Sequence, residues 1–254
     1  MIDVAEHGWL LFLVTLVALW LTARVGALAA RRHPLPREMR PDFNVLQGAA
    51  LTLLALIIGF SFAMASTRYD QRKNLEEAEA NAIGTEYFRA ALLPSGDADK
   101  VRALLKAWLD LRMQFYTATG ADNVRSINER TAKLQADLWA AVLPAANAAP
   151  TPISALAVAG MNDVLNAQGY TEAAWLNRIP PAAWFLMGAI ALCCNLLVGY
   201  GMHGTVSPRR LSAILPFFTA IAFGFIADID SPRHGIILVH PVNLISLSAS
   251  LPAA

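Results

Sequence analysis

The chain has 254 residues, of which 56% are hydrophobic and only 15% are charged, with a mean hydropathy of +0.44. These values are too apolar for an ordinary soluble domain and favour a membrane protein with a polar insert. The formal net charge of +1 provides no field that would attract a polyanion, so we expect no nucleic-acid partner. The only cysteines, Cys193 and Cys194, are adjacent within an apolar run and predict neither a disulfide framework nor a zinc site.

The first apolar run, from Trp9 to Ala30, has the length of a membrane-spanning helix. Its charged residue, Arg24, lies near the end of the run and can snorkel to the interface. A cleaved signal peptide is the alternative, because Ala27-Leu28-Ala29 resembles a small-residue cleavage site. The residues before the run include Asp3 and Glu6 but no Lys or Arg, which favours a retained helix.

A second apolar run, Val45–Ser66, contains no charge. About 22 residues with a rise of 1.5 Å each span about 33 Å, which is enough to cross a hydrocarbon core. Thr67–Asn81 follows without Pro or Gly and is rich in helix formers. We therefore predict one long helix over Val45–Asn81 that crosses the bilayer and continues into water.

From Thr67 to about Asn177 the sequence is more polar, with apolar residues at helical spacing and no sustained two-residue alternation. This pattern predicts helical hairpins, with breaks near Pro94, Gly120, Pro144, Pro150 and Gly169. Two further apolar segments, at residues 181–201 and 211–227, predict a third and a fourth membrane helix. The tail at residues 236–247 carries β-branched residues and predicts an extended or interfacial piece.

The predicted fold class is therefore all-α: a polytopic membrane protein with four transmembrane helices and a helical extramembrane insert between the second and the third. We expect residues 1–66 to form the first two membrane helices and residues 67–178 to form the insert, continuous with the second helix. Residues 179–228 would form the last two membrane helices, and residues 229–254 a C-terminal tail.

The two short connectors between membrane helices are basic. Their arginines are Arg31, Arg32, Arg37, Arg40, Arg209 and Arg210. The positive-inside rule counts such short loops, so it predicts cytoplasmic connectors, with the insert and both termini outside. Arg68, Arg72 and Lys73, just beyond the second membrane helix, favour the opposite orientation.

The sequence contains no motif of an enzyme active site. A Gly-rich phosphate loop, Gly-x-Ser-x-Gly and His-Glu-x-x-His are all absent, and the histidines show no metal-ligand clustering. Asp228 and Asp230 could suggest an aspartyl dyad, but a dyad needs carboxylates that converge from separate elements. They are better interpreted as a polar stop that ends the fourth membrane helix. We expect no catalytic residue, metal or cofactor.

The second helix carries a more specific pattern. Ile57, Phe60, Met64 and Arg68 share one stripe at spacings of three and four. Around a symmetry axis, the apolar members would form a hydrophobic constriction, and rings of arginine favour anions. We therefore consider Ile57, Phe60 and Met64 as pore-lining candidates and Arg68, Arg72 and Asp228 as candidates for charged rings.

Ordinary helix packing is the alternative interpretation of this stripe. Gly48 and Gly59 would allow close approach of a neighbouring backbone. The order of charges beyond the membrane, basic and then acidic, suggests that their partners lie on another helix or subunit. Asn195, in the third apolar segment, suggests an interhelical hydrogen bond.

Several stretches resemble bacterial proteins of the DUF4239 family, which are often labelled as bestrophin-like. The stretches are Gly59-Phe60-Ser61-Phe62, Arg68-Tyr69-Asp70-Gln71-Arg72, Glu79-Ala80-Asn81-Ala82-Ile83-Gly84-Thr85-Glu86-Tyr87, Leu92-Leu93-Pro94 and Asp228-Ile229-Asp230-Ser231-Pro232-Arg233-His234-Gly235. Together they extend over most of the chain.

The resemblance implies a relation to bestrophins, pentameric anion channels with four membrane helices per subunit, a pore lined by the second helix, and a helical cytosolic region. It would place the hydrophobic neck on residues such as Ile57, Phe60 and Met64. The acidic calcium clasp of bestrophins is not found in this sequence. The cytosolic region that the resemblance implies also conflicts with the orientation predicted from the connectors.

These observations lead to a hypothesis with one alternative. The leading hypothesis is a homo-oligomeric, bestrophin-like channel of the bacterial inner membrane for small inorganic anions or other small solutes. Its partners would be the lipid bilayer and its own copies. The alternative is a non-conducting membrane sensor or scaffold whose helical insert binds a partner or a ligand.

Overall fold

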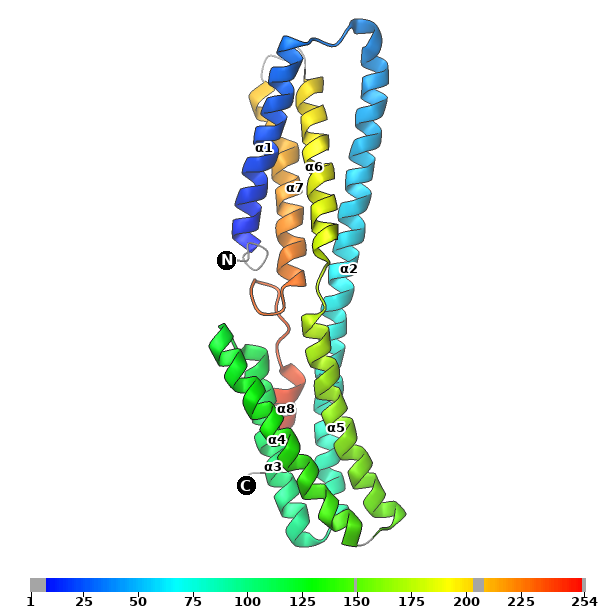
Figure 1. The fold of residues 1–254 in the computed structure, drawn as a ribbon, viewed down its shortest axis with the longest axis vertical. Coiled ribbons are helices and arrows are strands. Elements are labelled where there is room, and N and C mark those ends of the chain that lie inside the picture. The colour runs from blue at the N-terminus through cyan, green and yellow to red at the C-terminus, as the bar shows by residue number, and fades with distance from the viewer. Residues whose placement is uncertain (1–7, 149, 203–207, 253–254) are drawn as a thin grey trace. The chain divides into compact units, whose positions relative to one another are not determined.

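The computed structural model describes residues 8–148, 150–202 and 208–252, and these residues are helical, with turns between the helices and no strand. Figure 1 shows the order of the elements. The α-helices are α1 (Gly8–Arg32), α2 (Arg40–Arg89), α3 (Ser95–Thr117), α4 (Ala121–Ala148), α5 (Pro152–Leu176), α6 (Pro181–Gly201), α7 (Pro208–Asp230) and α8 (Val242–Ser250). Two 3-10 turns, η2 (Arg37–Met39) and η3 (Ala90–Leu92), lie at the two ends of α2.

Four helical segments are long and apolar enough to cross a membrane, by length and composition. They are α1, α2, a segment within Pro152–Gly201 that includes α6, and α7. The all-α prediction with four membrane helices is therefore confirmed. The long second helix is also confirmed, and it extends beyond the predicted range at both ends, from Arg40 to Arg89.

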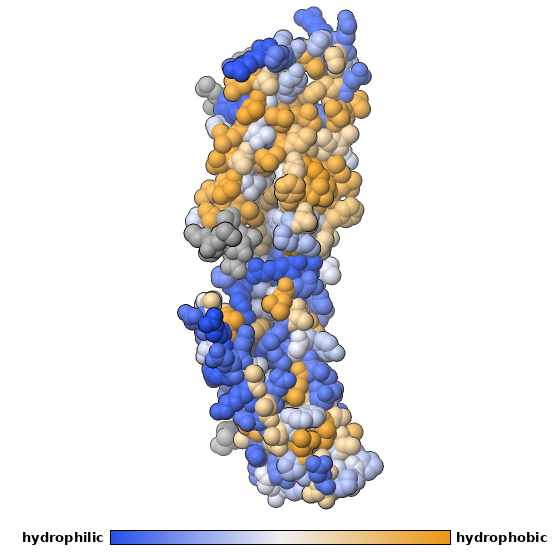
Figure 2. All heavy atoms as spheres, viewed as in Figure 1, coloured by the Kyte–Doolittle hydropathy of each residue, from blue (hydrophilic) through white to orange (hydrophobic). Residues whose placement is uncertain are grey.

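The chain divides into two compact units, and α2 contributes to both. The membrane unit comprises Met1–Arg68 and Arg178–Leu238, and the insert unit comprises Tyr69–Asn177 and Val239–Ala254. Hydrophobic side chains dominate the visible surface of the membrane unit in Figure 2, whereas hydrophilic side chains gather over the insert unit. This difference agrees with a bilayer around the first unit and water around the second.

In the membrane unit, α1 packs against α6 and α7 (Figure 1). A Cβ atom on Gly26 of α1 would collide with the carbonyl oxygen of Leu196 in α6, and one on Gly199 would collide with that of Ala23 in α1. Close backbone approach at small residues is how helices associate within a bilayer, where burial from water offers little drive. These two glycines therefore set the distance between α1 and α6.

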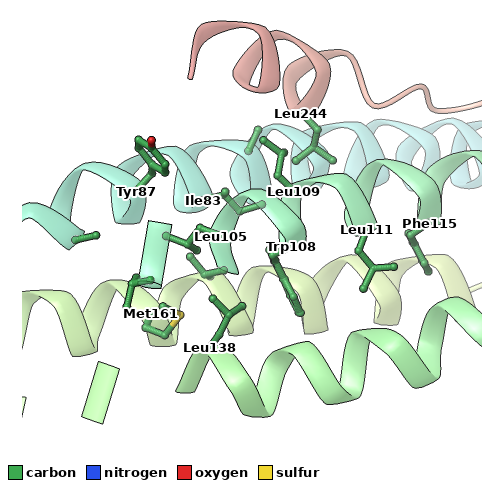
Figure 3. Close-up of a cluster of buried hydrophobic side chains, with 14 of the residues drawn as sticks. Ile83, Tyr87, Leu105, Trp108, Leu109, Leu111, Phe115, Leu138, Met161 and Leu244 are labelled. Carbon is green, nitrogen blue, oxygen red and sulfur yellow. The ribbon is translucent and has the colours of Figure 1, made fainter. Parts of the chain in front are cut away.

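The core of the insert unit is built from α2, α3, α4, α5 and α8. Figure 3 shows some of its buried side chains, among them Trp108 and Leu105 of α3, Leu138 of α4, Met161 of α5 and Leu244 of α8. All five are almost completely buried. Burial of this apolar surface from water supplies the main stabilisation of the unit.

Three expectations from the sequence are wrong. Pro144 lies inside α4 and Gly169 inside α5, so neither breaks a helix. The cost of about 1 kcal/mol for a helical glycine is offset by the burial of one face of α5. The prediction of an extended tail is also wrong from Val242 onward, because Val242–Ser250 forms α8, whereas residues 236–241 belong to no helix.

Candidate pore helix

The apolar stripe on α2 is divided between the interior and the surface of the membrane unit. Ile57 is partly buried and packs against the cluster that contains Leu54 and Met187. Phe60 is 69% exposed and Met64 is 39% exposed. The structure thus turns Ile57 toward the interior of the membrane unit, while Phe60 and Met64 are exposed on its surface.

The outward face of α2 continues along the membrane span. In the most apolar 18-residue stretch of this helix, only 17% of the residues are buried within the chain. A Cβ atom at Gly48 or Gly59 would meet nothing within 4 Å, and Val45 is 74% exposed. This face is therefore open to lipid or to a neighbouring subunit, and its glycines would permit a close approach.

At the end of the apolar run, Arg68 of α2 is paired with Asp230. The Arg68 Nη1 atom lies 3.5 Å from Asp230 Oδ1, at the last residue of α7. Both oxygens of Asp230 also accept the backbone N–H of Ile179, at 3.1 Å. One carboxylate thus connects α2, α7 and the segment that leads into α6.

Asp228, the acidic candidate for a charged ring, contacts the backbone of the turn that follows α7. Its carboxylate accepts the backbone N–H groups of Ile236 and Ile237, at 2.8 to 3.0 Å. Gly235 in this turn has a φ of +131°, a conformation that favours glycine, and a Cβ atom there would collide with Asp228. Asp228 therefore holds the turn that follows α7.

Arg72 lies one turn beyond Arg68 but belongs to the insert unit, where it is only 1% exposed. Its Nε atom donates to the carbonyl oxygen of Ala174, at 3.4 Å. Within a single chain the guanidinium thus joins α2 to α5. The structure does not bring together the six candidate residues, because Phe60 and Met64 are exposed while Arg72 is buried.

Further along α2, Glu76 anchors α8. Its Oε1 atom accepts the backbone N–H groups of Asn243 and Leu244, both at 2.9 Å, and its Oε2 atom accepts Asn243 Nδ2 at 2.6 Å. These N–H groups belong to the first turn of α8 and have no partner within that helix. The carboxylate thus explains why the tail ends in a docked helix.

Glu79 is the centre of a buried polar cluster in the insert unit. It forms an ion pair with Arg112 of α3, and both side chains are completely buried. The second carboxylate oxygen accepts hydrogen bonds from the Tyr116 hydroxyl at 3.2 Å and the Thr171 hydroxyl at 3.1 Å. Burial and the charge of Glu79 raise the pKa of Tyr116 well above its ordinary value. As expected, this acidic residue of α2 finds its partner on another helix.

Glu86, two turns further, is buried without a hydrogen-bond partner for either carboxylate oxygen among the described residues. Its pKa is raised from 4.5 to about 8, mainly by burial. Asp163 of α5 contributes to this rise, and Arg89 opposes it. The neighbouring backbone is Gly160, where a Cβ atom would collide with the Glu86 carboxylate. Glu86 is therefore held in its protonated form near neutral pH.

The sequence did not single out Asp230 as the partner of Arg68, or Glu86 as a buried acid. The sequence nevertheless contains a signal for this pair. Asp230 follows one apolar run and Arg68 follows another, so both charges are expected at a membrane boundary, where opposite charges tend to pair. Asn195 differs from expectation: its Nδ2 atom donates to Ala191 in the same helix, at 2.8 Å, and not to another helix. The described residues contain no group of three or more His, Cys, Asp or Glu that could hold a metal ion.

Comparison with known proteins agrees with this architecture. No curated protein matches the chain. Among solved structures, a variant of a bacterial bestrophin homologue from Klebsiella pneumoniae superimposes with a TM-score of 0.64 at 15% identity, over 94% of this chain and 99% of that one. A second variant gives a TM-score of 0.66 at 14% identity, over 94% and 97% of the two chains.

At such identity these structures show a shared fold. The family comparison goes further, because the model of the bestrophin-like domain matches residues 10–244. This match is compatible with the DUF4239 resemblance, although it does not confirm that label. It extends from α1 to α8 and covers nearly the whole chain, so this protein belongs to the bestrophin-like family.

Proposed function

We propose that copies of this chain assemble around a shared axis as an anion channel of the bacterial inner membrane, with α2 lining the pore. Membership of the bestrophin-like family supports a channel, and the family resemblance suggests a pentamer. The observation that carries the proposal is the exposed face of α2, where Phe60 and Met64 project away from their own unit. A helix that belonged only to the interior of a subunit would bury these side chains.

In such an assembly Phe60 and Met64 would form the hydrophobic constriction, with Ile57 at its flank. Narrow apolar rings can gate ion flow by dewetting. Arg68, at the end of the same stripe, would supply positive charge next to the constriction. Asp230 contacts the Nη1 atom of its guanidinium, and an anion in the pore would bind the other nitrogens.

The proposal does not need Arg72 or Asp228 in the pore. Arg72 is buried against α5, and Asp228 is engaged by the turn after α7. Rings of these two residues would require side chains to leave the contacts that they make in a single chain. We therefore assign the selectivity for anions to Arg68.

Planar-bilayer recording of the purified protein tests the proposal, together with the mass of the intact assembly in detergent. We expect an oligomer whose currents reverse near the anion equilibrium potential. Phe60→Ala should change the conductance severalfold, whereas Phe62→Ala should not, because Phe62 is exposed on another side of α2. A monomer without current across a range of pH and calcium concentrations would refute the channel.

The competing function is a non-conducting sensor or scaffold whose insert binds a partner. A groove of about 640 Å³ between α4 and α5 favours it, because its lining includes Trp139, Pro150 and Val158. Unchanged conductance in Phe60→Ala, together with a partner crosslinked to α4 or α5, would support this function over the channel.

A further inference from the structure

A second surface of the membrane unit carries a groove that the pore helix does not touch. The groove, of about 650 Å³, lies between α1 and α7, which run side by side in Figure 1. Its lining includes Leu16, Val17 and Trp20 of α1 and Ile214, Phe217 and Phe218 of α7. Both helices are candidate membrane spans, so the surroundings of this groove are hydrocarbon and not water.

A cation lies at one end of the groove. The guanidinium carbon of Arg24 is 4.7 Å from the centroid of the Trp20 ring, which itself lines the groove. This stacking is a cation–π contact that fixes the arginine one helical turn from the lining. The positive charge therefore lies against a side chain that lines the groove.

Arg24 has no anionic partner within the described part of the chain. It forms none of the ion pairs found there, and its Nε atom is buried without a hydrogen-bond acceptor. Arg24 lies eight residues before Arg32, the last residue of α1, or about 12 Å along the helix axis. An arginine at that depth reaches toward the headgroups, and it is costly in a membrane unless an anion accompanies it.

We propose that this groove binds an anionic phospholipid, with an acyl chain against α1 and α7 and the headgroup phosphate on Arg24. The apolar lining fits a hydrocarbon chain, and the unpaired guanidinium complements a phosphate, which it can bind through two parallel N–H groups. A zwitterionic lipid fits less well, because its own ammonium group competes for the phosphate. The site does not depend on the channel, since no residue of α2 lines it.

The test measures lipid binding to the full chain in nanodiscs that contain phosphatidylglycerol and phosphatidylcholine in equal amounts. Native mass spectrometry should show phosphatidylglycerol retained in preference to phosphatidylcholine. Arg24→Gln should weaken this preference about tenfold, because it removes hydrogen bonds between charged groups, and Arg24→Lys should retain part of it. Arg31→Gln is the matched control, because Arg31 is an exposed arginine of the same helix, away from the groove.

A second measurement needs no substitution at Arg24. Phosphatidylglycerol with a photoreactive acyl chain should crosslink to the peptides that contain Leu16–Trp20 and Ala213–Phe218, and Ala213→Trp, which fills the groove, should reduce this labelling. Equal retention of the two lipids, an Arg24→Gln variant that binds like the wild type, or crosslinks confined to other helices would overturn the proposal. Because the readout is lipid binding, a chain that binds lipid but passes no current would refute only the channel.

Discussion

The Nη1 atom of Arg68 lies 3.5 Å from Oδ1 of Asp230, and this contact joins the boundary of the apolar part of α2 to the last residue of α7. The side chains are 15% and 8% exposed, so water screens the pair only in part. The same carboxylate accepts the N–H of Ile179, which precedes α6. Three of the four membrane helices are thus held in register at one level by a single acidic residue.

We predict that Asp230→Ala and Arg68→Ala are coupled. Asp230→Ala leaves the partly buried charge of Arg68 without this carboxylate, and Arg68→Ala removes one of the contacts of the Asp230 carboxylate, each at a cost of roughly 1–3 kcal/mol. The double variant should lose less stability than the sum of the two single variants, because both single variants lose the same contact between Arg68 and Asp230. Thermal unfolding in detergent measures the three differences. Additive losses would contradict the pair.

Close packing of α1 and α6 leads to a second prediction. Gly26→Ala and Gly199→Ala should each destabilise the membrane unit by roughly 1–3 kcal/mol, because the new Cβ atom meets backbone that cannot move aside. Gly188→Ala is the matched control on α6, since a Cβ atom there meets nothing within 4 Å. If all three variants unfold at the same temperature, the close approach of the two helices is not a determinant of stability.

The insert unit should depend on the buried pair of Glu79 and Arg112. Glu79→Leu removes the buried partner of the Arg112 guanidinium and leaves it only the partly exposed carboxylate of Glu172, 3.1 Å from its Nη1 atom, so we expect a loss of roughly 1–3 kcal/mol. Combining it with Arg112→Met should restore part of the loss, because no buried charge then remains at this position and Glu172, which loses its partner, is partly exposed to water. Glu77→Leu serves as the control, since Glu77 is an exposed acid on the same helix. Chemical unfolding of the full chain, followed by tryptophan fluorescence, measures the order of stabilities.

Glu86 predicts a dependence of stability on pH. Its pKa is about 8 in the folded chain and close to 4.5 when exposed, so the folded state holds the proton more tightly. The contribution of the Glu86 proton to the free energy of unfolding is therefore fully present below about pH 4.5. It declines as the pH rises and is lost above about pH 8. Of the charged groups nearby, Arg89 on α2 lowers the pKa of Glu86 and Asp163 on α5 raises it.

Glu86→Gln should remove that slope, since an amide is neutral throughout this range. Melting temperatures of the wild type should fall between pH 5 and pH 8 more steeply than those of the variant, and the variant should be the more stable protein near pH 8. Asp163→Asn, on the facing helix, removes a negative charge near Glu86 and should lower the pKa of Glu86 in the folded chain. The decline in melting temperature should then end at a lower pH than in the wild type. Parallel profiles of wild type and Glu86→Gln would show that Glu86 does not titrate in the fold.

The arrangement of helices could be read largely from the sequence. Four apolar runs of spanning length and a long run without helix breakers determine where the chain crosses a membrane and where α2 continues beyond it. Such features depend on residues close together in the chain, namely their hydrophobicity and their helix propensity. The same local reasoning failed at Pro144 and Gly169, because packing of α4 and α5 outweighs a local preference for a break.

Only the tertiary structure decided which side chains of α2 are available for a site. The spacing of Ile57, Phe60, Met64 and Arg68 places them on one stripe, but burial depends on which helix packs on either flank of that stripe. Glu76 and Asn243 meet across 167 residues, and Arg68 and Asp230 across 162. Local periodicity sets the face of a helix, whereas contacts between distant segments determine what that face touches, because they depend on packing of the whole chain.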